Sequence, residues 1–482
     1  MAKEFVKELT SQAEDFSQWY IDVILKTQMA DYSCVRGCMN IRPYGYALWE
    51  NIRDAMDKRF KATGHVNAYF PLFMPESFLK KEAEHVEGFA PEVPWVTHVG
   101  NEPLTERLAI RPTSETIICA AYAEWIQSYR DLPVLINQWA NVVRWEKRTR
   151  LFLRTSEFLW QEGHTAHRTE DEAREETMKM LEVYRECCET ELAMPVMCGR
   201  KTEKEKFAGA VETYSIEALL KDGNALQAGT SHFLGQNFAK PFGIKFLDED
   251  NTEKFVWQTS WGVSTRLVGG VVMTHGDDSG LIMPPRIAPT QVVIIPVFKD
   301  DSKTLVLEEA ARICAELEAI GVRVKCDARE EFRPGYKYNE WEMKGVPLRV
   351  EIGPKDIEKG HVVMVRRLDR EKAFVPRAEL SVRIPEALAR LQKDLLEAAR
   401  KRQVEQTTEV ATLDELAEAL EKKRGFFWAG WDGSAETEAA VKERTKASIR
   451  NIPFEGSEPT AGMLDLVSGK PAKHRVLFAR AY

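Results

Sequence analysis

The sequence has little or none of several features that would assign it to a specialised class of protein. It contains 8 cysteines in 482 residues, too few for a framework of disulfides. No apolar run approaches the ~18 residues that a membrane span needs, and charged residues from Lys3 onward argue against a secretory signal. The net charge of −8 argues against a histone-like DNA binder. We therefore expect a cytoplasmic protein that contacts neither membranes nor DNA.

The composition that remains is that of a globular protein with several domains. Hydrophobic residues make up 44% of the chain and charged residues 29%, which excludes a disordered chain. At roughly 150 residues per domain, the length suggests about three domains. A proline-rich stretch at 284–289 indicates the first boundary, and a third region begins near residue 401. The predicted domains are 1–285, 286–400 and 401–482.

Hydrophobic periodicity in the first domain predicts an antiparallel sheet with helices around it. Apolar residues at four-residue spacing within 46–63, followed by Gly64, indicate an amphipathic helix. The capping box Thr169-x-x-Glu172 begins a second helix. Apolar and β-branched stretches joined by short polar links favour antiparallel strands. These stretches lie near 134–145, 152–160 and 256–273.

The rest of the chain has the alternating pattern of α/β domains. A strand-like run at 292–297, a helical pattern and a strand at 322–324 form a βαβ unit. Pro385 suits the first position of a later helix, and Thr412-x-x-Glu415 begins another. The predicted fold class is therefore α+β, with an antiparallel-sheet domain followed by an α/β domain and a small C-terminal α/β domain.

The most informative group of charged residues lies between Arg144 and Phe158. Arg144 and Glu146 stand two apart on a predicted strand and share a face, and a polar loop with further cations follows them. Guanidinium groups suit phosphates, and an aromatic ring suits a nucleotide base. A salt-bridged hairpin with a core phenylalanine explains the same spacing equally well, so spacing alone leaves both interpretations open.

These residues resemble the second signature motif of class II aminoacyl-tRNA synthetases, which reads Arg-x-Glu, a loop, then Arg-x-x-Glu-Phe. Residues 46–71 resemble the first motif of that class, and residues 260–266 resemble the third. Further stretches are similar to prolyl-tRNA synthetases of the archaeal/eukaryotic-like type, and the similarity covers essentially the whole chain. These stretches are Arg111–Glu115, Trp160–His164, Lys206–Ala210, Gln227–His232, Arg333–Lys337 and Gly353–Asp356.

The resemblance implies that the protein forms an adenylate. The carboxylate of L-proline would attack the α-phosphorus of ATP, supplied with Mg²⁺, and the prolyl group would pass to the 3′ end of tRNA(Pro). Arg144 and Arg266 would be catalytic, because they would neutralise charge that builds on phosphate oxygens. Phe158 would stack on adenine. The implied ATP site consists of Arg144, Glu146, Arg154, Thr155, Phe158, Gln227, Thr230 and Arg266.

The resemblance also implies a pocket for proline, in which Thr113 and Glu115 accept hydrogen bonds from the secondary ammonium. The implied proline site consists of Thr113, Glu115, Arg144, Trp160, Glu162, Phe207 and His232. From the residues alone, Thr113 and Ser114 suit the cap of a following helix better. His164 and His167 have no third ligand nearby in sequence, so we expect no metal there.

Residues 323–377 carry 14 Lys+Arg against 10 Asp+Glu. A solvated face explains this excess as well as a nucleic-acid site does. The resemblance implies that this region binds the anticodon of tRNA, whose exposed bases are recognised by hydrogen bonds to their edges and by stacking. The candidates that it implies are Glu342, Arg349, Lys355 and Asp356.

Two features depart from the pattern of many relatives. Many bind zinc through four cysteines in the C-terminal domain, but here no cysteine follows Cys326. The corresponding positions carry a poor set of zinc ligands, so we expect no zinc. These positions are Asp432, Thr437, Asp465 and Ser468. Bacterial-type relatives insert an editing domain between the second and third motifs, and the 103 positions from Phe158 to Trp261 are too few for it.

We therefore expect a homodimeric, cytoplasmic enzyme that ligates proline to tRNA(Pro). A threonine-specific relative is disfavoured because its metal-ligating residues have no evident counterpart. Two alternatives lie outside tRNA ligation. One is an adenylating ligase for a non-tRNA carrier, which would not need the domain at 286–400. The other is a non-catalytic RNA-binding regulator, which we would expect to have lost Arg144, Glu146 or Arg266.

Overall fold

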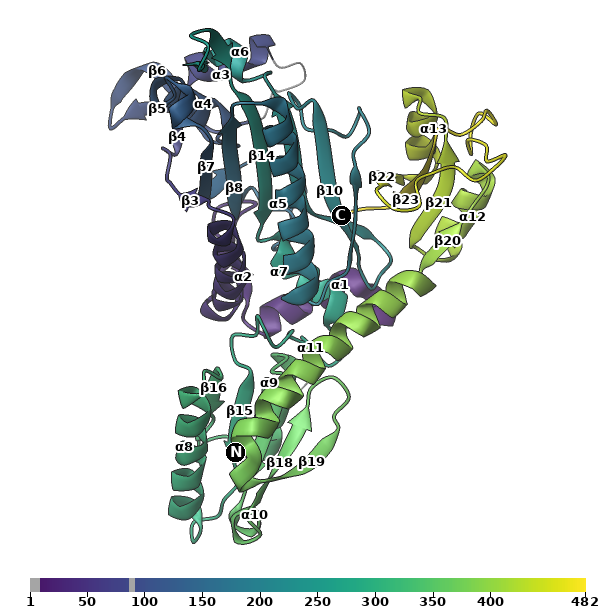
Figure 1. Cartoon of the computed structure of the whole chain (residues 1–482). Coiled ribbons are helices and arrows are strands. Elements are labelled where there is room, and N and C mark those ends of the chain that lie inside the picture. The colour runs from purple at the N-terminus through teal and green to yellow at the C-terminus, as the bar shows by residue number, and fades with distance from the viewer. Residues whose placement is uncertain (1–8, 86–91) are drawn as a thin grey trace.

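The computed structural model describes residues 9–85 and 92–482. Figure 1 shows a large sheet flanked by helices, a second body and a smaller C-terminal body. The second body carries α8 (Lys303–Ala319), α9 (Pro334–Met343) and α10 (Pro354–Glu358). The long helix α11 (Leu380–Glu405) runs diagonally from the second body to the third. It therefore continues through the boundary predicted at residue 400. No helix in the described ranges is long and apolar enough to cross a membrane.

The largest sheet joins the first and last parts of the chain. Among the described residues it has 11 strands in the order β20-β21-β23-β22-β9-β10-β11-β14-β8-β7-β3, and the edge strand β3 is Val66–Asn67. Its central pairs from β9 to β7 are all antiparallel. The central strands are β7 (Val134–Val143), β8 (Glu157–His167), β9 (Val196–Arg200), β10 (Glu212–Leu219), β11 (Ala225–Gly235) and β14 (Trp257–Ser264). The prediction of an antiparallel sheet is confirmed.

Helices cover one face of this sheet. These helices are α2 (Pro43–Ala62), α5 (Glu170–Thr190) and α7 (Arg266–His275). Their apolar residues form one core with the helix-facing side chains of the strands, among them Trp261 and Val263. The predicted capping box is present, because Thr169 accepts from the Glu172 backbone and Glu172 reaches back to Thr169. The opposite face of the strands is therefore free to carry polar residues.

Two predicted strand boundaries are wrong. The stretch 256–273 is a strand only to Ser264 and then forms α7. The prediction failed because α7 is buried on all sides. A helix of this kind has no polar face, so its sequence lacks the alternation of apolar and polar residues about every 3.6 residues that indicates a helix. The stretch 152–160 becomes a strand only at Glu157, because the preceding residues turn back in a hairpin in which Arg150 and Arg154 form an isolated bridge.

The second body contains a five-stranded sheet in the order β16-β15-β17-β18-β19. Its last three strands are β17 (Leu348–Ile352), β18 (His361–Arg366) and β19 (Lys372–Pro376). The predicted βαβ unit is present as β15 (Val292–Pro296), α8 (Lys303–Ala319) and β16 (Val324–Cys326), with the two strands parallel. The prediction for Pro385 is wrong, because this residue lies inside α11 instead of opening a helix. Leu380 and Ile384 are buried in the core under the sheet, and their packing holds the turn before the proline in helical form.

The C-terminal body extends the large sheet. Its strands are β20 (Thr407–Glu409), β21 (Phe426–Trp431), β22 (Ser448–Pro453) and β23 (His474–Ala479). Strand β22 pairs with β9, with Ile452 opposite Arg200. The second body is tied to the first by Arg367, whose guanidinium nitrogens lie 2.6 and 3.0 Å from the two carboxylate oxygens of Asp277. The second body and the C-terminal body therefore both contact the first body directly.

The buried His275 at the end of α7 predicts a loss of stability in mild acid. Burial lowers its pKa to about 3, below the usual value near 6.5. The unfolded chain therefore takes up the proton first, so this contribution to stability is complete above pH 6.5 and declines as the pH falls toward 3. Between pH 6.5 and 5 we expect His275 to lower the free energy of unfolding by about 2 kcal/mol.

The measurement is urea unfolding at pH 7 and pH 5. The variant His275→Gln should lose less stability between the two pH values than the unsubstituted protein. His98→Gln, on the exposed end of β5 (Trp95–Val99), serves as the control. Equal acid losses in all three proteins would contradict the prediction.

Candidate active site

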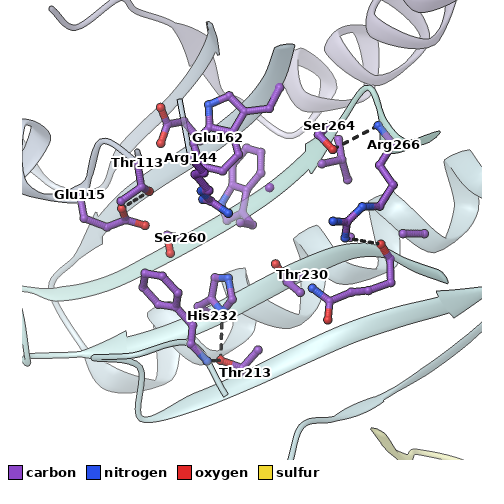
Figure 2. A pocket seen from close by; sticks show the side chains of 18 of the residues that line it. Thr113, Glu115, Arg144, Glu162, Thr213, Thr230, His232, Ser260, Ser264 and Arg266 are labelled. Atoms are coloured by element: carbon purple, nitrogen blue, oxygen red, sulfur yellow. Dashed lines mark hydrogen bonds between the residues drawn. The ribbon is translucent and has the colours of Figure 1, made fainter. Parts of the chain in front are cut away.

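A pocket of about 380 Å³ opens on the polar face of the large sheet. Figure 2 shows side chains converging on it from several strands and from the turn that carries Thr113 and Glu115. All residues predicted for the proline site line this pocket, namely Thr113, Glu115, Arg144, Trp160, Glu162, Phe207 and His232. Of the predicted ATP site, Arg144, Phe158, Gln227, Thr230 and Arg266 also line it.

The remaining ATP-site candidates lie in an adjoining hollow of about 60 Å³. Glu146, Arg154 and Thr155 line it, and it shares Arg144, Phe158 and Arg266 with the main pocket. Arg154 donates to Glu146 over 2.7 Å, so the hairpin is salt-bridged, as the alternative interpretation held. The same interpretation placed Phe158 in a core, but Phe158 is only half-buried and lines the pocket.

The alternation of the antiparallel strands explains why these side chains converge. In β8, the even-numbered residues Phe158, Trp160, Glu162 and His164 line the pocket, whereas Gln161 bonds Tyr184 of α5 on the other face. Gly163 leaves room for the ring of Trp261, because a Cβ at Gly163 would lie 2.1 Å from that ring. The floor of the pocket therefore depends on close contact between β8 and β14.

Carboxylates gather at one end of the pocket. Glu162 accepts hydrogen bonds from the Ser114 hydroxyl (2.5 Å), the Gln138 amide (2.7 Å) and His164 (3.1 Å). Burial by itself would raise the pKa of Glu162, but these donors and the charge of His164 lower it below its usual range. Glu115 accepts from the Thr113 hydroxyl. This end of the pocket therefore suits a cation that donates hydrogen bonds.

Ser114 shows that the capping interpretation does not hold for this helix. It stands at the N-cap position of α4 (Glu115–Trp125), but its side chain makes no capping hydrogen bond. It donates instead to Glu162, and Thr113 donates to Glu115. Both hydroxyls are therefore committed to the carboxylates of the pocket.

Guanidinium groups gather toward the other end. Arg144 donates to the Pro112 carbonyl over 2.9 Å and lies 5.1 Å from the ring centre of Trp160. The side chain of Arg144 is exposed, and Glu115, Glu162 and Glu146 favour its charged form. Burial, reinforced by the charge of Arg144, lowers the pKa of Arg266 to about 10. Both arginines remain cationic near neutral pH, so this end suits an anion such as a phosphate.

Polar atoms without partners line the space between the two ends. The Ser260 hydroxyl and the Trp160 indole nitrogen are buried and have no hydrogen-bond partner among the described residues. Burial lowers the pKa of His232 to about 3, so its ring is neutral, and its Nδ1 lies 3.0 Å from the Thr213 hydroxyl (Figure 2). Buried polar groups are normally paired, so these atoms are available to a ligand.

The sequence reasoning missed several residues of the pocket wall. Ser260 and Ser264 lie within the third motif, and Thr213 is the second residue of β10, the strand between two recognised stretches. A search for alternating polar residues on the strands would have found them. Lys201 and Glu205 also line the pocket, but they lie in a loop with no periodicity, and only the tertiary structure brings them there.

The anticodon candidates lie in the second body and fall into two groups. Glu342 and Arg349 line a hollow of about 120 Å³ that also contains Arg367 and Arg370. Lys355 and Asp356 lie on α10 (Pro354–Glu358). Asp356 is held by the Gly353 amide at 2.9 Å and by His361 at 3.2 Å. The four residues are therefore not gathered in one pocket.

The four residues at the positions of zinc ligands in many relatives form a hydrogen-bonded cluster. Asp432 accepts from Thr437 and Ser468, each over 3.0 Å, and Asp465 accepts from the backbone amides of Asp432 and Ser468. Zinc prefers thiolate and imidazole in structural sites, and the cluster offers neither. These residues do not fit a zinc ion.

Comparisons with known proteins identify the class and then the family. Residues 96–275 match the model of the tRNA synthetase class II core domain (G, H, P, S and T). Residues 291–387 match an anticodon binding domain, and residues 413–482 match the C-terminal domain of prolyl-tRNA synthetase. The fold and the pocket are therefore those of a class II aminoacyl-tRNA synthetase.

Full-length relatives narrow the assignment further. The chain is 58% identical to a proline–tRNA ligase of Natranaerobius thermophilus, over 100% of this chain and 99% of the relative. It is 60% identical to that of Symbiobacterium thermophilum over the same shares, and 56% identical to that of Rubrobacter xylanophilus over 99% of this chain and 100% of the relative. The chain belongs to the prolyl-tRNA synthetase family.

The contact between Gly163 and Trp261 predicts that Gly163→Ala damages the pocket. The added methyl group would overlap the indole ring, and overpacking of this kind costs about 1–3 kcal/mol. We expect a lower thermal midpoint and slower proline-dependent ATP–pyrophosphate exchange. Gly335→Ala is the control, because a Cβ there meets nothing within 4 Å. Exchange at the unsubstituted rate in Gly163→Ala would contradict this account of the pocket floor.

Proposed function

We propose that the chain activates L-proline with ATP in this pocket and transfers the prolyl group to the 3′ end of tRNA(Pro). The observation that carries the proposal is the division of the pocket into a carboxylate end and a guanidinium end. Proline offers an ammonium to the first and its carboxylate to the second, where ATP offers phosphates. The family assignment supports proline and tRNA as the substrates.

The reaction requires positioning and charge neutralisation from the protein, with no protein nucleophile. An oxygen of the proline carboxylate attacks the α-phosphorus, the bond to the β-phosphate breaks, and pyrophosphate leaves with the electron pair. Arg144 is suited to the α-phosphate and the carboxylate, because it is the guanidinium whose charge also interacts with Glu115 and Glu162 at the carboxylate end. Arg266 and Arg154 are suited to the outer phosphates. Preorganised cations of this kind stabilise charge that develops in the transition state, and Mg²⁺ enters as part of the ATP substrate.

In this proposal the remaining residues recognise proline and the nucleotide. Thr113 and Glu115 accept from the ammonium of proline, and Trp160, Glu162, Phe207 and His232 shape its pocket. Phe158 stacks on adenine. Glu146 accepts from the adenine amino group through the carboxylate oxygen that does not face Arg154. Thr155, Gln227 and Thr230 contact the nucleotide.

The second body supports tRNA as the acceptor over a non-tRNA carrier. It matches an anticodon-binding domain, which a carrier ligase would not need. In this proposal Glu342, Arg349, Lys355 and Asp356 contact anticodon bases. A non-catalytic regulator is disfavoured because Arg144, Glu146 and Arg266 are all present and line the two hollows.

We further propose a cytoplasmic homodimer that holds no zinc and does not bind DNA. Apolar side chains exposed on β4 (Phe73–Pro75) and β5 support the dimer, because Phe73 is 45% and Val99 68% exposed and a second copy would cover them. A monomeric mass in sedimentation at micromolar concentration would contradict the dimer. One tightly held zinc per purified chain would contradict the absence of zinc.

The first test is charging of total tRNA with each of the twenty amino acids. We expect charging with proline. Arg144→Lys should lower proline-dependent ATP–pyrophosphate exchange by about 100-fold, because a lysine cannot contact two oxygens in parallel. Arg148→Lys, on the exposed hairpin loop, is the matched control. Exchange without charging would indicate a different acceptor, and no exchange with proline would refute the proposal.

The pocket also predicts incomplete rejection of alanine. A smaller amino acid is rejected only by the contacts it lacks, at about 1–3 kcal/mol per methylene. The 103 positions between Phe158 and Trp261 hold strands and helices of the core itself, and we therefore expect no hydrolytic correction in the same chain. Alanine should support slow pyrophosphate exchange. Rapid deacylation of alanyl-tRNA by this protein alone would show the prediction wrong.

A further inference from the structure

Three buried charged residues connect the C-terminal body to the wall of the active-site pocket. Lys201 follows β9, Glu217 lies on β10, and Arg450 lies on β22 of the C-terminal body. Their exposed fractions are 4%, 0% and 7%. The Lys201 ammonium lies 2.9 Å from one oxygen of Glu217, and two nitrogens of Arg450 lie 2.9 and 3.1 Å from the other. We call these residues the interdomain triad.

Strand pairing between the two bodies produces this arrangement. Ile452 of β22 lies opposite Arg200 of β9, so Lys201 and Arg450 come together just beyond the paired residues. Lys201 also donates to the Arg450 carbonyl over 2.6 Å. The side chain of Asn451 donates to the Met197 carbonyl over 3.1 Å and fixes the same junction. The triad is therefore built only when the C-terminal body is docked.

Two basic groups share one carboxylate, so the triad has one positive charge when Lys201 is protonated. Burial lowers the pKa of Lys201, whereas Glu217 and the pocket residue Glu205 favour its charged form. Lys201 lines the active-site pocket, and its hydrogen bonds to Glu217 and Arg450 use two of its three N–H groups. Among the described residues its third N–H has no acceptor within bonding distance. A buried cation in that position is available to an anionic ligand.

The triad lies on the guanidinium side of the pocket. Glu217 stands opposite Gln227 in the pairing of β10 with β11, and Gln227 accepts from Arg266 through its carbonyl over 3.3 Å. Glu217 and Arg450 act on the pKa of Arg266 in opposite directions, since Glu217 raises it and Arg450 lowers it. The triad therefore lies within electrostatic range of the end of the pocket where phosphates are expected.

We propose that Lys201 is a phosphate-facing cation of the active site, and that Glu217 and Arg450 are the residues that position it, so that the C-terminal body takes part in ATP binding. Two other contacts hold the same loop, from Thr202 to Glu438 and from Glu205 to Lys442. Those contacts keep the loop in place but present no cation to the pocket. The proposal rests on the proposed function, because it needs ATP as the ligand.

The experiment measures KM and kcat of ATP–pyrophosphate exchange for both ATP and proline. The variants are Lys201→Met, Arg450→Met and the double variant, with Arg450→Lys as the conservative replacement. Arg424→Met is the matched control, since Arg424 is an exposed cation that also joins the C-terminal body to the first body, through Asn224. Thermal midpoints of all variants are measured in parallel.

We expect Lys201→Met to raise KM for ATP by about tenfold and to leave KM for proline within about twofold. Arg450→Met should raise KM for ATP in the same direction, and Arg450→Lys should restore most of it. Because Arg450 acts through Lys201, the double variant should be no worse than Lys201→Met alone. Arg424→Met should behave as the unsubstituted protein.

Several results would overturn the proposal. One is a parallel rise of both KM values, and another is a lowered thermal midpoint with KM for ATP unchanged, since either would make the triad a structural contact. Independent effects that multiply in the double variant would show that Arg450 does not act through Lys201. Normal ATP–pyrophosphate exchange with slow transfer to tRNA in Lys201→Met would indicate that Lys201 contacts phosphates of tRNA and not those of ATP. Absence of proline-dependent exchange in the unsubstituted protein would refute the proposed function itself.

Discussion

The alternation of side chains along antiparallel strands is the constraint on which the rest of this structure depends. Each central strand buries one row of residues under α2, α5 and α7 and presents the other row to the pocket. Trp261 and Val263 pack in the core under the helices, whereas the Ser260 hydroxyl of the same strand is one of the pocket's polar atoms without a partner among the described residues. A one-residue slip of register would exchange the two rows, so the packing that stabilises the sheet also sets the chemistry of its open face.

The open face carries paired carboxylates at one end and guanidinium groups at the other. Glu162 is satisfied by three donors, and Glu115 by Thr113. The exposed Arg144 and the half-buried Arg266 donate chiefly to backbone carbonyls. Their charges are therefore open to an anionic ligand. The pocket is thus organised for a substrate with an ammonium and for one with phosphates.

The bodies are joined by charged contacts that lie near functional groups. Arg367 binds Asp277 just after α7, the helix that begins with Arg266. Arg450 reaches Glu217 through a sheet that continues from the C-terminal body into the first body. Contacts from both smaller bodies therefore stabilise the elements of the active site, although all residues that line the pocket belong to the first body.

The sequence by itself determined the class of fold, the family and most of the pocket. The residues proposed for the proline site lie in short runs that resemble known motifs, and all of them line the one pocket. Tertiary structure alone decided the rest. The helical state of 266–273 and the interior position of Pro385 depend on burial by distant segments, and Lys201 reaches the pocket only through contacts with residues 16 and 249 positions away. Such contacts leave no periodic pattern in the chain, because they follow from packing between elements and not from the order of residues within one.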